Sequence, residues 1–591
     1  MRLPLALAIA PLLACATPAA TRADPAATQA EAGVVHPDAL HPRSTIDAGE
    51  SGSAAFVASL REEYRALGHI QKVLGWYEST QGEKQLGQLT YLGHGRLFGR
   101  AALDAVSVVQ EQGGLAPNDA LALRFFRRAL TSEVVTLATV KLDDAFSAAE
   151  ANATVVLPWL PKPLAYRDVG NTIALEPDAA RRAQIFAATT AVIEEKLNPI
   201  LEEREAAAQK AARETGFADY VALSEDLRSV KLSDLLAEGV RYVQATDSLY
   251  LQVLDRVARE ELGIAREKLR LADNARLARA PKLAQHFEKT LELKALLNFL
   301  SGIGLDLHTA ANTEVQIDDS LFPKKVPRAF VNPVDAPGDV RLSVKPVGGL
   351  NDYWTLFHEA GHAVHFANAT IEPKELVNLG HGAPSEAFGE FFRQAFSDPR
   401  WLVRYRAFLV AQGKPAPSNA ELAGVLRRTA LGEMMYLRRY CFAKIAYELR
   451  LHGRPESEIA PALALLPEKP ASLRDLYRAL FSRAYGFELN DAEAQRYRID
   501  VDDTFYAADY ARCFALAGMM HEGIRRRFGE DWYGNRDVGR FLKTELFAPG
   551  TSLSPEEVAA KLGFAPTIDF ALSAQRAARL VTEADALEKS K

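Results

Sequence analysis

Residues 358–362, His-Glu-Ala-Gly-His, place two imidazoles and a carboxylate at a spacing that suits metal chemistry. On a helix, side chains four residues apart leave the same face, so His358 and His362 are expected to point at one site. Two neutral histidines at this spacing can bind one Zn²⁺ ion, and Glu359 beside them can accept a proton. This stretch therefore predicts a catalytic zinc site with Glu359 as its general base.

The zinc site needs a third ligand, because catalytic zinc takes three protein ligands and leaves one position for water. His365 is one candidate, but seven residues of straight helix span about 10.5 Å, too far for three side chains to converge on one ion. We expect His365 to pack near the site instead. Glu386 follows His358 by 386 − 358 = 28 residues, and a loop and a second helix can return its carboxylate to the metal. Glu386 is the predicted third ligand.

The second helix can begin at Pro384 or Ser385. Glu386 and Glu390 then lie on one helix face, four residues apart. One of these carboxylates would bind the metal, and the other would hydrogen-bond a ligand imidazole from outside the ligand set.

A proline-rich break precedes the helix that carries the two histidines. Its prolines exclude one continuous helix: Pro323, Pro327, Pro333, Pro337 and Pro346. Residues 340–345 alternate apolar and polar side chains, which predicts a half-exposed strand. Gly348 and Gly349 end the strand, and Asn351 or Asp352 can cap the helix. An exposed strand edge beside a zinc ion can hold an extended peptide through main-chain hydrogen bonds.

Gly361 lies inside the predicted metal helix, where glycine costs about 1 kcal/mol relative to alanine. A helix tolerates this cost more readily where another backbone or a ligand must come close. The glycine therefore predicts a close approach at this turn.

The rest of the chain has an ordinary globular composition. The whole chain has 591 residues, of which 48% are hydrophobic and 25% are charged. Lys and Arg number 70 against 76 Asp and Glu, which gives a net charge of −6 and argues against a nucleic-acid partner. From Phe56 onward, apolar residues recur at helical spacing, with one stretch bent or interrupted at Pro199, so the predicted fold class is mainly α. We expect one helical domain over 55–591, with the active-site half at about 320–525.

The N-terminus predicts export. Arg2 precedes an apolar run at residues 3–14, as in a secretory signal peptide (1–23) that is too short to span a membrane as a mature helix. Two processing sites remain open. The residues ending at Cys15 resemble a bacterial lipoprotein box, and Thr-Arg-Ala before Asp24 is a small-x-small cleavage site.

Residues 24–54 are rich in Ala, Pro, Thr, Ser and Gly, which predicts a low-complexity tether. The protein is expected to be exported, either periplasmic or anchored to the outer membrane as a lipoprotein through Cys15. That lipid anchor is the one membrane contact expected. Cys441 and Cys513 are the cysteines that follow, and they can form one disulfide or remain two buried thiols.

His-Glu-Ala-Gly-His followed by Glu-Ala-Phe-Gly-Glu at 386–390 resembles the zinc peptidases related to angiotensin-converting enzyme and to thimet oligopeptidase and neurolysin. Residues 339–345 resemble the substrate-pairing strand of these enzymes. His365 matches the extended His-Glu-x-Gly-His-x-x-His form of the oligopeptidases. The detailed resemblance covers about 325–395 and a piece near 500–515.

This resemblance implies a two-lobed helical ellipsoid with a deep channel, one zinc ion at the channel floor and a small β element beside the metal helix. Short peptides that fit the channel would be the substrates, and folded proteins would be excluded. The oligomeric state is left open.

The resemblance also points to two tyrosines near the C-terminus. Tyr506 and Tyr510 lie four residues apart, and a phenol hydroxyl can stabilise the oxyanion of a tetrahedral intermediate. Both match active-site tyrosines of the oligopeptidases. Compared with converting enzyme, residues 510–514 resemble Tyr-Ile-Arg-Tyr-Phe, which places Cys513 where a catalytic tyrosine stands. Tyr510 is the favoured candidate and Tyr506 the second.

These features predict a zinc-dependent oligopeptidase of the cell envelope. A dipeptidyl carboxypeptidase of the converting-enzyme type is one alternative, with Lys345 or Arg512 available to capture the C-terminal carboxylate of a substrate. A non-catalytic, exported peptide-binding protein of the same fold is the other.

Overall fold

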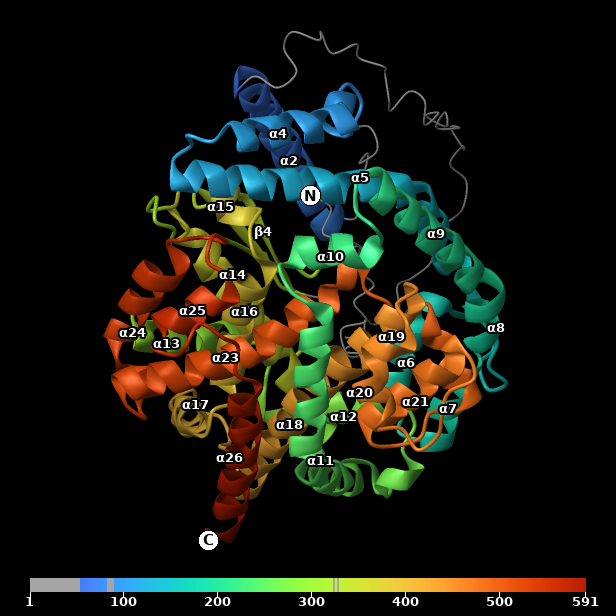
Figure 1. Ribbon diagram of the computed structural model, residues 1–591. Coiled ribbons are helices and arrows are strands. Elements are labelled where there is room, and N and C mark those ends of the chain that lie inside the picture. The colour runs from blue at the N-terminus through green and yellow to red at the C-terminus, as the bar shows by residue number, and fades with distance from the viewer. Residues whose placement is uncertain (1–53, 82–89, 323–324, 327–328, 591) are drawn as a thin grey trace, which may run out of the picture.

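The computed structural model describes residues 54–81, 90–322, 325–326 and 329–590. These residues are mostly helical, with two small sheets (Figure 1), so the mainly α fold class is confirmed. The predicted signal peptide (1–23) and the tether (24–54), apart from Ala54, lie outside the described residues. Within the described part of the chain, no helix is both long and apolar enough to cross a membrane.

Three helices form a layer at the top of Figure 1: α2 (Ala54–Gln81), α4 (Arg100–Gln112) and α5 (Pro117–Asn152). They pack around a hydrophobic cluster of their own, which includes Leu60, Val106 and Phe126 and is separate from the main core.

A run of helices continues from this layer down the right side and the centre of the view: α6 (Val169–Leu175), α7 (Ala179–Ala187), α8 (Thr190–Val192), α9 (Asn198–Glu214), α10 (Tyr220–Arg228), α11 (Leu232–Leu262) and α12 (Asp273–Arg279). Helix α13 (Glu292–Ile303) comes next in the chain and lies on the left of the view. A short antiparallel pair precedes these helices, β1 (Thr154–Val155) with β2 (Leu164–Ala165). A π-helical turn at Ile193–Leu197 separates α8 from α9, which carries Pro199 in its first turn. The predicted interruption is therefore confirmed.

A three-stranded sheet packs beside the metal helix. Its strands are β3 (Gln316–Asp318), β4 (Phe330–Asp335) and β5 (Asp339–Ser343), in the order β3-β5-β4. β5 pairs in parallel with β3 and antiparallel with β4, so both of its edges are occupied. The strand predicted at 340–345 exists, but the expectation that it offers an exposed edge is wrong. β3 has too few residues to show an alternation of apolar and polar side chains in the sequence. It pairs with one edge of β5.

The metal helix α14 (Leu350–Ala367) begins earlier than predicted. Gly348 and Gly349 both have positive φ, and Gly349 is the N-cap. Neither Asn351 nor Asp352 caps the helix. Instead, the Asp352 carboxylate accepts hydrogen bonds of 2.7 Å from the backbone N–H groups of Val347 and Gly348. The two glycines make a turn that no other residue adopts easily, and the helix starts directly after it.

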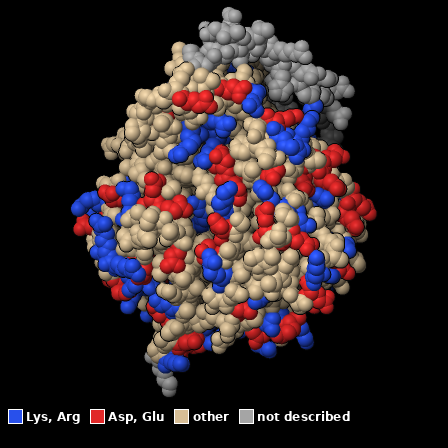
Figure 2. Space-filling model, in the orientation of Figure 1, with Lys and Arg blue, Asp and Glu red and all other residues tan. Residues whose placement is uncertain are grey.

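The remaining helices complete the molecule: α15 (Glu375–Asn378), α16 (Gly382–Phe396), α17 (Pro399–Ala411), α18 (Asn419–Leu437), α19 (Ile445–Leu451), α20 (Ala460–Leu463), α21 (Leu473–Tyr485), α22 (Asp491–Ala494), α23 (Tyr506–Phe528), α24 (Arg536–Phe541), α25 (Pro555–Lys561) and α26 (Phe570–Lys589). In the main core, α16 packs between α14 and α23. Cys441 and Cys513 are both buried and free, so they are two thiols and not a disulfide. Basic and acidic side chains are interspersed over the face in Figure 2.

Candidate metal centre

Glycines let the backbones of α14 and α16 meet. A Cβ on Gly361 would lie 2.5 Å from the Phe388 carbonyl oxygen, and a Cβ on Gly389 would lie 2.9 Å from the ring of His358. Neither position accepts a side chain unless a helix moves. The close approach predicted at Gly361 is confirmed, and it sets the histidine face of α14 against the first turns of α16.

This packing brings the three predicted ligands together. Nε2 of His358 lies 3.1 Å from Nε2 of His362. Oε2 of Glu386 lies 3.6 Å and 3.8 Å from these two nitrogens. Zinc–nitrogen bonds in a tetrahedral site place ligand atoms about 3.3 Å apart. Two imidazoles and one carboxylate are also a donor set of catalytic zinc, so these residues fit a zinc ion.

Burial and neighbouring charges set the protonation of the three ligands. Burial lowers the pKa of His362 to about 4, despite the charge of Glu386. Burial acts the same way on His358, but its contact with Glu386 and the charge of Glu359 raise its pKa above the usual value. Burial opposes ionisation of Glu386, yet its contacts with the two histidines and with Tyr506 lower its pKa to about 2. Glu386 is thus ionised and His362 neutral at neutral pH, as ligands must be.

Glu390 is held away from the ligand histidine. Its carboxylate lies 3.9 Å from Nδ1 of His358, too far for a hydrogen bond. Arg393 donates to both oxygens of Glu390, and Gln394 donates to one of them. The predicted hydrogen bond between this glutamate and a ligand imidazole is therefore wrong, because side chains three and four residues along the same helix engage the carboxylate.

Ser385 connects the ligands to His365. Its hydroxyl lies 3.3 Å from Nδ1 of His362 and 3.4 Å from Nδ1 of His365. His365 is fully buried, with Nε2 3.1 Å from the carbonyl oxygen of Gly550. It lies behind the ligands, as predicted. The sequence interpretation missed the contact of Ser385, and the only signal was its position directly before Glu386.

Tyr506 and Tyr510 lie in the first turns of α23, next to the metal ligands. The Tyr506 hydroxyl donates a hydrogen bond of 2.8 Å to Oε1 of Glu386. The Tyr510 ring packs edge-on against Tyr506, with centroids 4.8 Å apart, and in the described part of the chain its hydroxyl has no hydrogen-bond partner. Burial and the charge of Glu386 raise the pKa of both phenols well above the usual value. Both are therefore protonated donors at neutral pH, and of the two only the Tyr510 hydroxyl is uncommitted among the described residues.

The part of the chain that carries this site matches a known protein family. Residues 347–577 match the family model described as peptidase family M3. This part of the chain is therefore similar to peptidase family M3. This is the family of zinc metallopeptidases of the thimet oligopeptidase and neurolysin type, so the resemblance seen in the sequence is confirmed. The match supports peptide hydrolysis by a metallopeptidase. No curated protein compared with the chain matches it.

The matched region, 347–577 (the M3 region), contains the three candidate ligands and both tyrosines. It also contains Arg512, whose side chain bonds to other groups of the protein. The Arg512 side chain is buried, pairs with Glu556 at 3.0 Å and donates to the carbonyl oxygen of Arg228 at 2.9 Å. It is therefore not available to a substrate carboxylate. Lys345, just before the M3 region, is half-buried and donates to the carbonyl oxygen of Lys325 at 3.2 Å.

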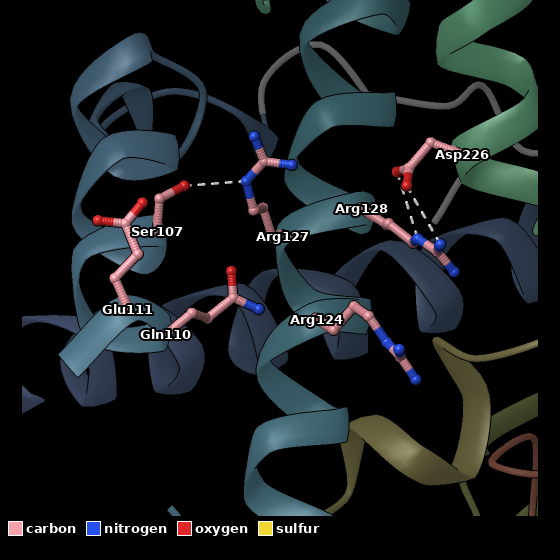
Figure 3. A pocket seen from close by; sticks show the side chains of 7 residues that line it. All are labelled: Ser107, Gln110, Glu111, Arg124, Arg127, Arg128 and Asp226. Atoms are coloured by element: carbon pink, nitrogen blue, oxygen red, sulfur yellow. Dashed lines mark hydrogen bonds and ion pairs between the residues drawn. The ribbon is translucent and has the colours of Figure 1, made fainter. Parts of the chain in front are cut away.

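An open cavity of about 390 Å³ lies outside the M3 region, between α4, α5 and α10 (Figure 3). Its walls carry three arginines of α5, but Figure 3 shows their guanidinium groups pointing in different directions. Arg127 donates to the Ser107 hydroxyl, and Arg128 pairs with Asp226. None of the metal-site residues lines this cavity.

Proposed function

We propose that the protein is a zinc-dependent oligopeptidase that hydrolyses peptide bonds in short peptides. The observation that carries the proposal is the meeting of His358, His362 and Glu386, whose ligand atoms lie 3.1–3.8 Å apart, beside Glu359 on the same helix. The match of residues 347–577 to the M3 family model supports the peptidase class.

The residues of the site divide the chemistry among them. His358, His362 and Glu386 would hold a zinc ion, which would supply a Lewis acid and make a water molecule acidic enough to ionise near neutral pH. Glu359 accepts the proton of the attacking water and passes it to the leaving amine. Tyr510 donates its hydroxyl hydrogen to the carbonyl oxygen as negative charge develops there. Tyr506 is the second candidate for this role, but its hydroxyl already serves Glu386.

The sheet beside α14 offers a way to align an extended peptide. β5 is central, so a peptide that adds a strand would pair with β4 or β3, the outer strands of the described sheet. β4 packs against α14 and is the nearer of the two along the chain. A deep channel that admits short peptides and excludes folded proteins is part of the proposal.

The oligopeptidase mode is preferred to dipeptide release because Arg512, one of the two cations considered for a C-terminal carboxylate, is paired with Glu556. A non-catalytic peptide-binding protein would need neither Glu359 as a general base nor a complete set of metal ligands. We further propose export to the bacterial periplasm or outer membrane, on the strength of Arg2, the apolar residues 3–14 and the box ending at Cys15.

The proposal is tested with the purified protein, synthetic peptides of graded length and a folded protein as control. Zinc is removed with a chelator and then restored, and products are identified by mass spectrometry. We expect internal cleavage of the peptides that is lost with zinc and returns with it, and an intact control protein. Release of dipeptides alone would assign the carboxypeptidase mode. No cleavage by the zinc-loaded protein would contradict the proposal.

A further inference from the structure

We propose that Arg228, on α10 and outside the M3 region, is a positioning residue that holds Tyr506 against the metal ligand Glu386. The inference rests on the proposed function, because it extends the metal site to a helix that the family match does not include. Four contacts of one guanidinium carry it.

The backbone that leads into Tyr506 has an uncommon conformation. Thr504 and Phe505 have φ values of 47° and 52°, and neither is glycine. Consecutive non-glycine residues in the left-handed region persist only where surrounding contacts hold them, and such turns gather at functional sites. The direction in which Tyr506 leaves this turn therefore depends on the groups that fix Thr504.

Helix α10 supplies those groups. Nε of Arg228 donates to the carbonyl oxygen of Thr504 at 3.0 Å, and Nη2 donates to its hydroxyl at 2.6 Å. The Tyr220 hydroxyl, at the other end of α10, accepts the backbone N–H of Thr504 at 2.7 Å. Thr504 is thus held on both sides of its peptide unit by one helix.

The same guanidinium reaches the first turn of α23 and, through it, α16. It lies over the Tyr506 ring at 4.7 Å from the centroid, and Nη1 donates to Oδ2 of Asp509 at 2.8 Å. Asp509 is buried against Gly382, the first residue of α16, where a Cβ would lie 2.8 Å from Oδ2. Arg228 on α10 therefore binds the first turn of α23 at the point where α23 contacts the start of α16.

One hydrogen bond connects the position of Tyr506 to the orientation of the proposed metal ligand Glu386. The Tyr506 hydroxyl donates to Oε1 of Glu386 and leaves Oε2 toward the histidines. Hydrogen bonds to ligating groups fix their orientation, and their loss typically weakens metal binding or activity by about 10–100-fold. If Arg228 acts by aiming Tyr506, its effect must disappear once the Tyr506 hydroxyl is absent.

A double-mutant cycle separates this role from a general contribution to folding. The proteins are wild type, Arg228→Met, Tyr506→Phe and the double variant. Asp226→Asn is the matched control, because Asp226 lies on the same helix and pairs with Arg128 beside the open cavity. The readouts are zinc affinity by competition with a chelator, kcat and KM for one synthetic peptide, and the melting temperature without zinc.

We expect Arg228→Met to weaken zinc affinity and lower kcat by about tenfold, with KM changed by less than about twofold. In the Tyr506→Phe background, the same change should add less than about twofold. Asp226→Asn should match wild type. The inference is overturned if Arg228→Met matches wild type, or if its full effect persists in the Tyr506→Phe background.

Arg228→Lys keeps the experiment decisive if the methionine variant does not fold. Lysine retains the charge but lacks the planar fork, so it should show a smaller loss that also vanishes with Tyr506→Phe. If the wild type binds zinc but cleaves no peptide, the proposed function fails. The cycle on zinc affinity still decides whether Arg228 acts through Tyr506.

Discussion

The Tyr506 hydroxyl donates a hydrogen bond of 2.8 Å to Oε1 of Glu386, while Oε2 of the same carboxylate lies 3.6 Å from Nε2 of His358. One oxygen of the ligand thus faces a tyrosine and the other faces the histidines. The two tyrosine hydroxyls therefore differ, because that of Tyr510 has no hydrogen-bond partner among the described residues.

Replacing Tyr506 with phenylalanine should weaken zinc binding by about tenfold, because Glu386 loses the hydrogen bond that orients it. Zinc affinity is measured by chelator competition at neutral pH. A variant with unchanged affinity would show that Glu386 is oriented by other contacts.

Replacing Tyr510 with phenylalanine should leave zinc affinity unchanged and lower kcat by about 10²–10³-fold, the usual cost of removing one oxyanion donor. Steady-state kinetics on a single peptide, with the zinc content determined for the same sample, provide the measurement. If Tyr506→Phe shows the larger loss of kcat at full zinc occupancy, the two roles are reversed.

Replacing Gly361 with alanine should destabilise the protein by about 1–3 kcal/mol, as overpacked cores do. The new Cβ would lie 2.5 Å from the Phe388 carbonyl oxygen and 2.7 Å from Cα of Gly389. Urea unfolding measures the change. Gly432→Ala is the control, because Gly432 lies inside α18 with nothing within 4 Å of an added Cβ, and there alanine should stabilise by about 0.5–1 kcal/mol. Equal effects at both glycines would contradict the packing of α14 on α16.

Stability should fall on mild acidification, partly through His452. Burial and the charge of Arg204 lower the pKa of His452 to about 3, and its side chain is 5% exposed. The unfolded chain binds a proton near pH 6.5, so this contribution is complete above that pH and is lost as the pH falls toward about 3. Between about pH 7 and 5.5 the loss amounts to about 1 kcal/mol from this residue.

The variant His452→Gln removes this titration. Its free energy of unfolding should therefore fall less than that of wild type between the same two pH values, by about 1 kcal/mol. An identical decrease in both proteins would assign the acid sensitivity to other groups.

The meeting of the three candidate ligands could be predicted from the sequence because it rests on local rules. His358 and His362 share a helix face by periodicity, and Glu386 follows at a distance that one loop and one helix turn can close. Gly361 indicated the close approach that makes this possible. These signals lie within one stretch of the chain.

The remaining features depend on contacts between distant segments. Nothing near Arg228 in the sequence indicates that its guanidinium reaches Thr504 and Asp509. The helix face shared by Tyr506 and Tyr510 does not reveal which hydroxyl reaches Glu386, because that depends on the left-handed turn at Thr504 and Phe505. The central position of β5 was hidden for the same reason, since its partner β3 has only three residues.

The most direct test of the central claim compares wild type with Glu359→Gln under identical conditions, measuring zinc content and peptide cleavage in each sample. Glu359 is not one of the proposed metal ligands, which are His358, His362 and Glu386. We predict equal zinc content and a loss of turnover of about 10²–10⁴-fold, the contribution of a general base. Near-normal cleavage by the zinc-loaded variant would contradict the account.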